Sequence, residues 1–309
     1  MKKLGEYING NCKVTLFDDG TKIRFTPDDE FLPVKPESMD LKITNRCTGT
    51  NCAFCHERSG PEGEHGDIMD LKFIDTLLPY TEIALGGGNV LEHPDFVPFL
   101  EKCKARNLIC NVTFNQIHFL QSLDSIRCLV EKEMIYGVGV SFLASNSRDG
   151  ANSLAEILSM PIFSNAVVHV INGIHSVEML EPLMDKGIKI LILGYKTFGR
   201  GVNYGKLMDP IIKKRQQELK DKLPSLIPHF KAVSFDNLAI NQLGVKDILS
   251  PEQWDSFYMG EEGQFTMYID AVRREYATCS IAEERFPLKD DIEPMFQHIR
   301  KITGNAKEG

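Results

Sequence analysis

The spacing of apolar and polar positions changes along the chain, and each change predicts a different kind of element. Near the N-terminus, segments 13–17 and 22–25 alternate apolar and polar residues on either side of Asp18-Asp19-Gly20. This pattern predicts a β-hairpin. After a proline-rich connector, residues 27–36, short apolar runs alternate with segments whose apolar residues recur every three or four positions. Such a succession is typical of strands and helices in turn.

Six of the apolar runs have the length of strands and are separated by helix-like segments. They are residues 39–44, 82–85, 108–114, 136–142, 166–171 and 189–193. Repeated strand–helix units predict a parallel sheet with right-handed crossovers. The near-continuous apolar run 189–193 predicts a strand that is covered on both faces. Since six units are fewer than the eight of a closed TIM barrel, we expect an α/β fold, a partial (βα)6 TIM-type barrel.

After about residue 205 the strand–helix repetition ends and an α+β extension is expected. Its predicted elements are a polar helix at 209–222, a strand at 231–235, a helix opening at Ser250, a hairpin of 265–270 and 275–279, and a helix at 292–302. We therefore expect three parts. These are the N-terminal β-hairpin with its connector (1–37), the barrel core (38–205) and the C-terminal extension (206–309).

Composition and charge narrow the class of protein. With 42% hydrophobic and 25% charged residues, the sequence is ordinary for a soluble globular chain. Its net charge of −8 argues against general nucleic-acid binding, which depends on clustered Lys and Arg. We find neither an apolar run long enough for a membrane span nor a signal peptide, so the sequence predicts a cytoplasmic protein. In that compartment the eight cysteines are not expected to form disulfides.

Three cysteines, Cys47, Cys52 and Cys55, follow the first barrel strand within nine residues of polar loop. Chance clustering of core cysteines is one interpretation. A zinc site that uses His56 or a distant thiol is another, and it would make the chain a non-enzymatic, zinc-stabilised binding protein. The c-type haem pattern Cys52-Ala-Phe-Cys55-His56 leaves Cys47 unused and requires export. An iron–sulfur cluster uses all three thiolates and leaves one iron open to another ligand.

The cysteine loop, together with Gly86-Gly87-Gly88-Asn89 after the second strand, resembles the radical S-adenosylmethionine (SAM) superfamily over about residues 38–200. The usual family motif places three residues between the first two cysteines and two between the last pair, with an aromatic before the last. Phe54 and the second gap fit. The first gap holds four residues, 48–51, which gives CX4CX2C. The family's Gly-Gly-Glu has Gly88 in place of its glutamate here.

The resemblance implies that Cys47, Cys52 and Cys55 hold a [4Fe–4S] cluster at which bound SAM is cleaved reductively. It further implies a flavodoxin or ferredoxin as electron donor and a 5′-deoxyadenosyl radical that abstracts hydrogen from an unidentified substrate. The residues expected to bind the cofactors are Phe54, Gly86, Gly87, Gly88, Asn89, Asn115, Ser141 and Asn172.

Other polar residues are candidates for substrate chemistry. The loop after the sixth strand is flanked by glycines and carries Tyr195, Lys196 and Arg200, which we expect to be catalytic or to contact substrate. His65 and His93 are candidate acid–base groups, and residues 61–67 are a candidate lid.

The substrate class is open between a peptide and a nucleotide or other small molecule. The hairpin around 265–279 resembles the C-terminal hairpin of family members that modify peptides and carry an auxiliary cluster. Those domains need several cysteines, and only Cys279 occurs here. We therefore expect a degenerate version of that domain without a second cluster.

Overall fold

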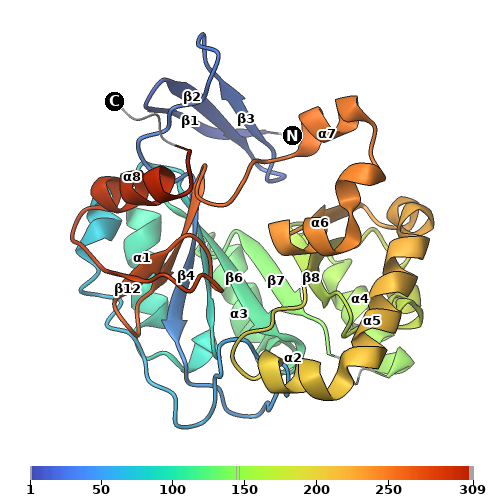
Figure 1. Ribbon diagram of the computed structural model, residues 1–309. Coiled ribbons are helices and arrows are strands. Elements are labelled where there is room, and N and C mark those ends of the chain that lie inside the picture. Colours follow the sequence, from blue (N-terminus) through green and yellow to red (C-terminus); the bar gives the residue numbers. More distant parts are fainter. Residues whose placement is uncertain (1, 144, 146, 306–309) are drawn as a thin grey trace.

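The computed structural model describes residues 2–143, 145 and 147–305, which form a small and a large β-sheet (Figure 1). The small sheet is antiparallel and consists of β1 (Lys3–Asn9), β2 (Cys12–Phe17) and β3 (Lys22–Phe25). The predicted hairpin is confirmed as β2 and β3. The strand β1 was not predicted and completes the sheet.

The large sheet has ten strands in the order β10-β9-β8-β7-β6-β5-β4-β11-β12-β13. Its strands are β4 (Ser38–Thr44), β5 (Glu82–Gly87), β6 (Ile109–Asn115), β7 (Gly137–Ser141), β8 (Ala166–Ile171), β9 (Lys189–Leu193), β10 (Ala232–Phe235), β11 (Thr266–Asp270), β12 (Glu275–Ala277) and β13 (Phe286–Pro287). The six predicted strands lie side by side as β4 to β9, all parallel. The sheet exceeds these six, because β10 adds to β9 and β11 adds to β4, both in parallel.

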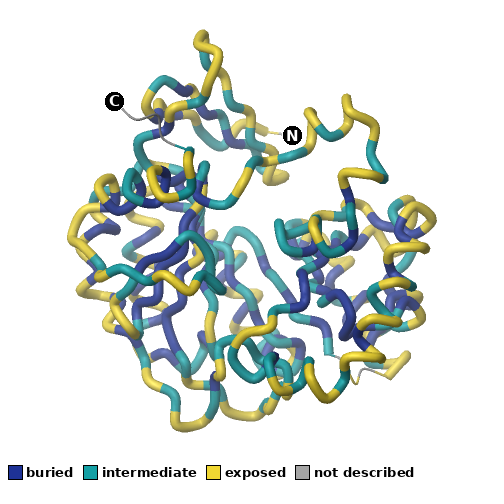
Figure 2. The backbone as a smooth tube through the Cα atoms, viewed as in Figure 1, coloured by how far each residue is buried: buried dark blue, intermediate teal, exposed yellow. Residues whose placement is uncertain are grey.

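Helices pack on the outer face of the large sheet and build the main core with it (Figures 1 and 2). They are α1 (Phe96–Ala105), α2 (Gln116–Gln121), α3 (Leu123–Glu131), α4 (Arg148–Leu158), α5 (Gly201–Leu226), α6 (Asn237–Leu243) and α8 (Ile292–Ile302). The remaining α-helix of the described residues, α7 (Pro251–Phe257), contributes no buried residue to this core. Within the described residues, no helix has both the length and the apolar character that a membrane span requires.

The inner face of the sheet borders a cavity of about 830 Å³ instead of a packed core. The interior of a closed TIM barrel is filled by bulky branched side chains. Here four inward positions on β5 and β7 carry only glycine or alanine, namely Ala84, Gly86, Gly137 and Gly139. The prediction that 189–193 is covered on both faces is wrong. Ile190 and Ile192 are buried outward, whereas Lys189, Leu191 and Leu193 line the cavity.

The small sheet covers part of the cavity at the N-terminal ends of the parallel strands. Its β2–β3 turn contributes Asp19 and Gly20 to the cavity wall. The side-chain amide of Asn165 donates to the carbonyl of Asp18 at 3.0 Å, and the hydroxyl of Tyr136 donates to the carbonyl of Phe17 at 3.2 Å. The turn therefore forms a floor beneath the barrel.

Candidate functional site

The loop that carries the three cysteines leaves β4 at the C-terminal edge of the sheet. Backbone hydrogen bonds fold it back on itself, from the amide of Cys47 to the carbonyl of Gly60 at 2.9 Å and from Cys55 to Cys52 at 3.1 Å. Arg200 binds the loop from the other side. Its Nε donates to the carbonyl of Cys52 at 2.9 Å, and one terminal nitrogen donates to the carbonyl of Ser59 at 2.8 Å. The loop is therefore fixed at both ends.

The longer gap between Cys47 and Cys52 is anchored at its first residue, Thr48. The amide and hydroxyl of Thr48 both donate to Glu92 Oε1, at 2.8 and 2.9 Å. His118 Nε2 bonds the carbonyl of Thr48 at 2.7 Å. Gly49 then turns the chain with φ of +76°, a conformation that favours glycine. The extra residue is thus accommodated as an anchored turn, with Glu92 and His118 as the residues that sequence reasoning missed.

All three thiols line the large cavity. Burial raises the pKa of the Cys47 and Cys52 thiols, and the neighbouring Cys55 thiolate raises both further because like charges repel one another. Two polar groups touch the sulfurs, Thr50 Oγ1 at 3.1 Å from Cys47 and the Asn115 amide at 3.9 Å from Cys52. Among the described residues, no three His, Cys, Asp or Glu side chains stand in an arrangement that would hold a metal ion.

The glycines at the end of β5 have two different structural roles. A Cβ on Gly88 would lie 2.1 Å from the carbonyl oxygen of Arg46, and one on Gly87 would lie 2.3 Å from that of Thr44. These two glycines therefore let β5 pack directly against the start of the cysteine loop. Gly86 differs, because a Cβ there would meet nothing within 4 Å and would project into open space.

The remaining residues expected to bind cofactors divide into two groups. Phe54, Asn115 and Ser141 line the cavity with the glycines. Asn89 and Asn172 lie outside the described cavity wall. Asn89 accepts from the amide of Leu91 as a helix cap, and the Asn172 amide donates to Gln242 at 3.1 Å.

The three residues expected to be catalytic all line the cavity. The Tyr195 hydroxyl donates to the carbonyl of Gly201 at 2.6 Å, so it is already occupied. Arg200 holds the cysteine loop, which is a positioning role. Lys196 extends from the loop after β9 and donates to Ser280 Oγ at 3.0 Å. Of the three, Lys196 presents the charge best placed to meet a ligand.

The two candidate acid–base histidines lie beside the end of β4, outside the described cavity wall. His65 Nδ1 is 2.9 Å from Thr44 Oγ1, and His93 Nε2 bonds the carbonyl of Gly66 at 2.8 Å. An antiparallel bridge from Thr44 to His65 fastens the candidate lid segment to the sheet.

A buried ionic network that sequence reasoning did not identify lies next to the cysteines. Lys42 Nζ is 2.7 Å from Glu57 and 3.0 Å from Asp270, which joins β4 to β11. Burial alone would raise the pKa of Glu57, but its hydrogen bond to His56 and the ammonium of Lys42 lower it to about 2. The sequence does hold a signal for this inner face, since polar residues alternate with apolar ones along 38–44 and 109–115.

Protonation of a buried histidine should weaken the fold near the site. His175 bonds the carbonyl of Phe142 and the amide of Ile171, which ties the ends of β7 and β8 together. Burial lowers its pKa from 6.5 to about 4. The unfolded chain therefore takes up a proton first, and stability is lost as the pH falls from about 6.5 to 4. We expect wild type to lose roughly 3 kcal/mol more over this range than His175→Gln. Urea unfolding at pH 7 and pH 4 measures the difference, and equal losses would contradict the assignment.

Neither protein-family models nor the sequences of curated proteins give a match to this chain. Solved structures of SuiB from Streptococcus suis match this chain. The complex of SuiB with its precursor peptide SuiA is 14% identical and covers 87% of this chain and 67% of SuiB, with a TM-score of 0.57. The complex of SuiB with S-adenosylmethionine is 13% identical and covers 83% of this chain and 64% of SuiB, with a TM-score of 0.55. The chain thus spans about two thirds of the length of SuiB and shares its fold.

Proposed function

We infer that the protein is a radical SAM enzyme that binds a [4Fe–4S] cluster and SAM at the C-terminal edge of the sheet. The observation that carries this inference is a single cavity lined by Cys47, Cys52 and Cys55 beside the open position at Gly86. The shared fold with SuiB, which was solved with SAM bound, supports it.

The donor set fits the proposed cluster. Three cysteine thiolates suit iron–sulfur ligation and leave one iron without a protein ligand. Because burial raises the pKa of Cys47 and Cys52, ligand binding must displace their protons. When bound, the cluster and SAM would supply a reductive cleavage that yields a 5′-deoxyadenosyl radical, with the electron from a flavodoxin or ferredoxin.

The residues of this chain would position the cluster and SAM and would exclude water from the cavity. Arg200 and Glu92 fix the cysteine loop, and the space beside Gly86 lies where the methionyl end of SAM is expected. Phe54 packs edge-to-face on Tyr204, with ring centroids 5.7 Å apart, and forms an apolar part of the wall. Lys196 faces the same cavity and would contact the substrate. A precursor peptide occupies SuiB, which favours a peptide substrate here.

Metal analysis and product analysis test this function. Protein purified without oxygen and reconstituted should hold about four irons per chain. With a low-potential reductant it should convert SAM to 5′-deoxyadenosine, measured by liquid chromatography. Omission of the reductant is the control and should abolish the product. Stoichiometric zinc without iron, and no 5′-deoxyadenosine, would instead favour the zinc-stabilised binding protein.

A further inference from the structure

Asp40 lies on the inner face of β4, in the wall of the large cavity. It lies deeper in the barrel than the cysteine loop, which follows the end of the same strand. In the sheet register its neighbours are Ala84 on β5 and Tyr268 on β11. Alanine contributes only a methyl group at this level. The carboxylate of Asp40 therefore faces open space within the barrel.

Acidic residues close to Asp40 are neutralised by cations that the small sheet supplies. Glu37 accepts from Arg24 at 2.8 Å, and Glu82 pairs with Lys22 at 2.7 Å. Arg24 and Lys22 both lie on β3 and reach down to the base of the large sheet. The chain thus provides a specific partner for each of these two carboxylates.

Asp40 is different, because within the described part of the chain its carboxylate has no hydrogen bond and no ion pair, although its backbone pairs in the sheet. The nearest cation on its own strand, Lys42, is already shared by Glu57 and Asp270. The positive charge of Lys196 also acts on Asp40, but the Lys196 ammonium donates its hydrogen bond to the hydroxyl of Ser280.

This isolation has an electrostatic cost. The side chain of Asp40 is exposed to the space of the cavity, but the surrounding walls remove part of its hydration and raise its pKa, which the charge of Lys196 lowers only in part. The acidic residues Asp236 and Glu262, with Glu57, raise it further. A carboxylate that has lost part of its hydration and has no partner is less favourable than a paired one. A positive group from outside the chain would remove that cost.

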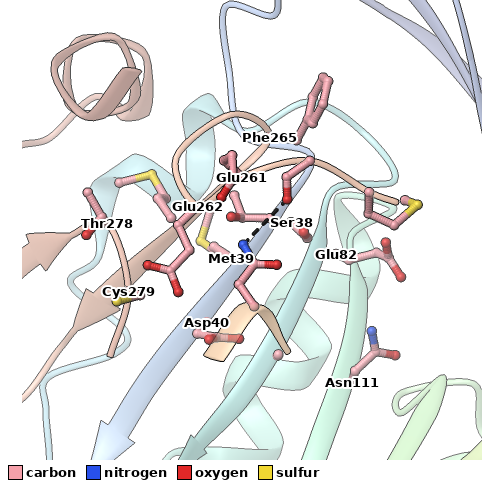
Figure 3. Close-up of a pocket in the computed structure, with 16 residues that line it drawn as sticks. Ser38, Met39, Asp40, Glu82, Asn111, Glu261, Glu262, Phe265, Thr278 and Cys279 are labelled. Carbon is pink, nitrogen blue, oxygen red and sulfur yellow. Dashed lines mark hydrogen bonds between the residues drawn. The ribbon is translucent and has the colours of Figure 1, made fainter. Parts of the chain in front are cut away.

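A second opening leads to the same carboxylate. A cavity of about 410 Å³, drawn in Figure 3, shares Asp40, Glu82, Ala84 and Asn111 with the large cavity. Glu261 and Glu262 lie across from Asp40 on the segment before β11. An acidic rim attracts cations and raises their local concentration. Asp40 is therefore accessible from this rim as well as from the cysteine loop.

We propose that Asp40 recognises a cationic group of the substrate, a primary amine or a guanidinium, inside the barrel. Either group donates hydrogen bonds to a carboxylate, and such charge-assisted bonds are strong in a confined site. That the cationic group belongs to a substrate rests on the proposed radical SAM function, whereas binding of a cation by Asp40 does not. In this arrangement Asp40 sets specificity at one end of the cavity and the cysteine loop lies at the other.

Binding of small model compounds to the anaerobically purified full chain tests the proposal. The probes are the amides of N-acetyl-lysine and N-acetyl-arginine, with N-acetyl-norleucine amide as the uncharged analogue of lysine. At least one cationic probe should bind wild type about tenfold more tightly than the norleucine compound, by titration calorimetry. Asp40→Asn should remove this preference, whereas Glu283→Gln, a change at an exposed position, should keep it. No SAM cleavage is needed, so a failure of the radical chemistry would leave this result unaffected.

Thermal melting separates recognition from a structural role. Because the Asp40 carboxylate lacks a partner, Asp40→Asn should raise Tm at pH 7 by about 2 °C or more. A carboxylate that supports the fold would lower Tm when replaced. Equal affinity for charged and uncharged probes, or an unchanged preference in Asp40→Asn, would overturn the proposal. So would a variant that loses affinity for SAM instead of the cationic probe, since Asp40 would then belong to the cofactor site.

Discussion

Replacing Cys52 with alanine should abolish reductive cleavage of SAM and deplete the protein of iron. Cys52 lies between the other two cysteines in sequence and shares the cavity wall with both. With two thiolates left, a cubane cluster would lack a protein ligand on a second iron. Loss of even an outer partner of a metal ligand costs 10–100-fold. We therefore expect 5′-deoxyadenosine formation to fall at least about 100-fold.

Cys128→Ala is the matched control, because Cys128 is exposed on α3 and lies outside the described cavity wall. It should retain the iron content and activity of wild type. Iron, sulfide and 5′-deoxyadenosine are measured on the three proteins after identical reconstitution. Cleavage of SAM at equal rates by wild type and Cys52→Ala would show that the assignment of the site is wrong.

Alanine at Gly88 should destabilise the fold, whereas alanine at Gly86 should leave it intact and weaken SAM binding. At Gly88 the new Cβ would lie 2.1 Å from the backbone oxygen of Arg46, so the cysteine loop must shift. Overpacking of this kind costs about 1–3 kcal/mol. At Gly86 the methyl group meets no protein atom within 4 Å and enters the cavity.

The pair separates packing from ligand binding with the same chemical change two residues apart. Melting should give a lower Tm for Gly88→Ala and an unchanged one for Gly86→Ala. Calorimetry should show SAM affinity reduced about tenfold in Gly86→Ala, since one methyl group of misfit costs about 1–3 kcal/mol. Wild-type affinity in Gly86→Ala would place SAM elsewhere. A wild-type Tm in Gly88→Ala would contradict the tight contact with Arg46.

The sequence pointed to those parts of the candidate site that are local in the chain. The three cysteines lie on the loop that directly follows β4 and the glycine run lies at the end of β5, so motif and strand pattern locate them together. The six parallel strands followed from their apolar runs for the same reason. Asn89 and Asn172 illustrate the limit, because asparagine after a strand serves equally well as a cap, as Asn89 does, or as a partner of another side chain, as Asn172 does with Gln242.

The residues of the barrel interior could not be predicted in this way. Lys42 and Asp270 form an ion pair across 228 positions of sequence, and only the parallel pairing of β11 with β4 brings them together. The lack of a partner for the Asp40 carboxylate likewise depends on which acidic residues the lysines and arginines of several distant segments pair with. Polar positions on β4 and β6 alternate with apolar ones and indicate an inner face, but alternation alone does not identify partners.

The floor of the cavity belongs to the β2–β3 turn and not to the barrel that carries the cysteines. Turns tolerate insertions and deletions far better than strands of a sheet. A descendant of this protein could therefore acquire a deeper or shallower chamber by a change of a few residues around Asp19 and Gly20. The depth of the cavity and the geometry of the cysteine loop would then change independently of one another.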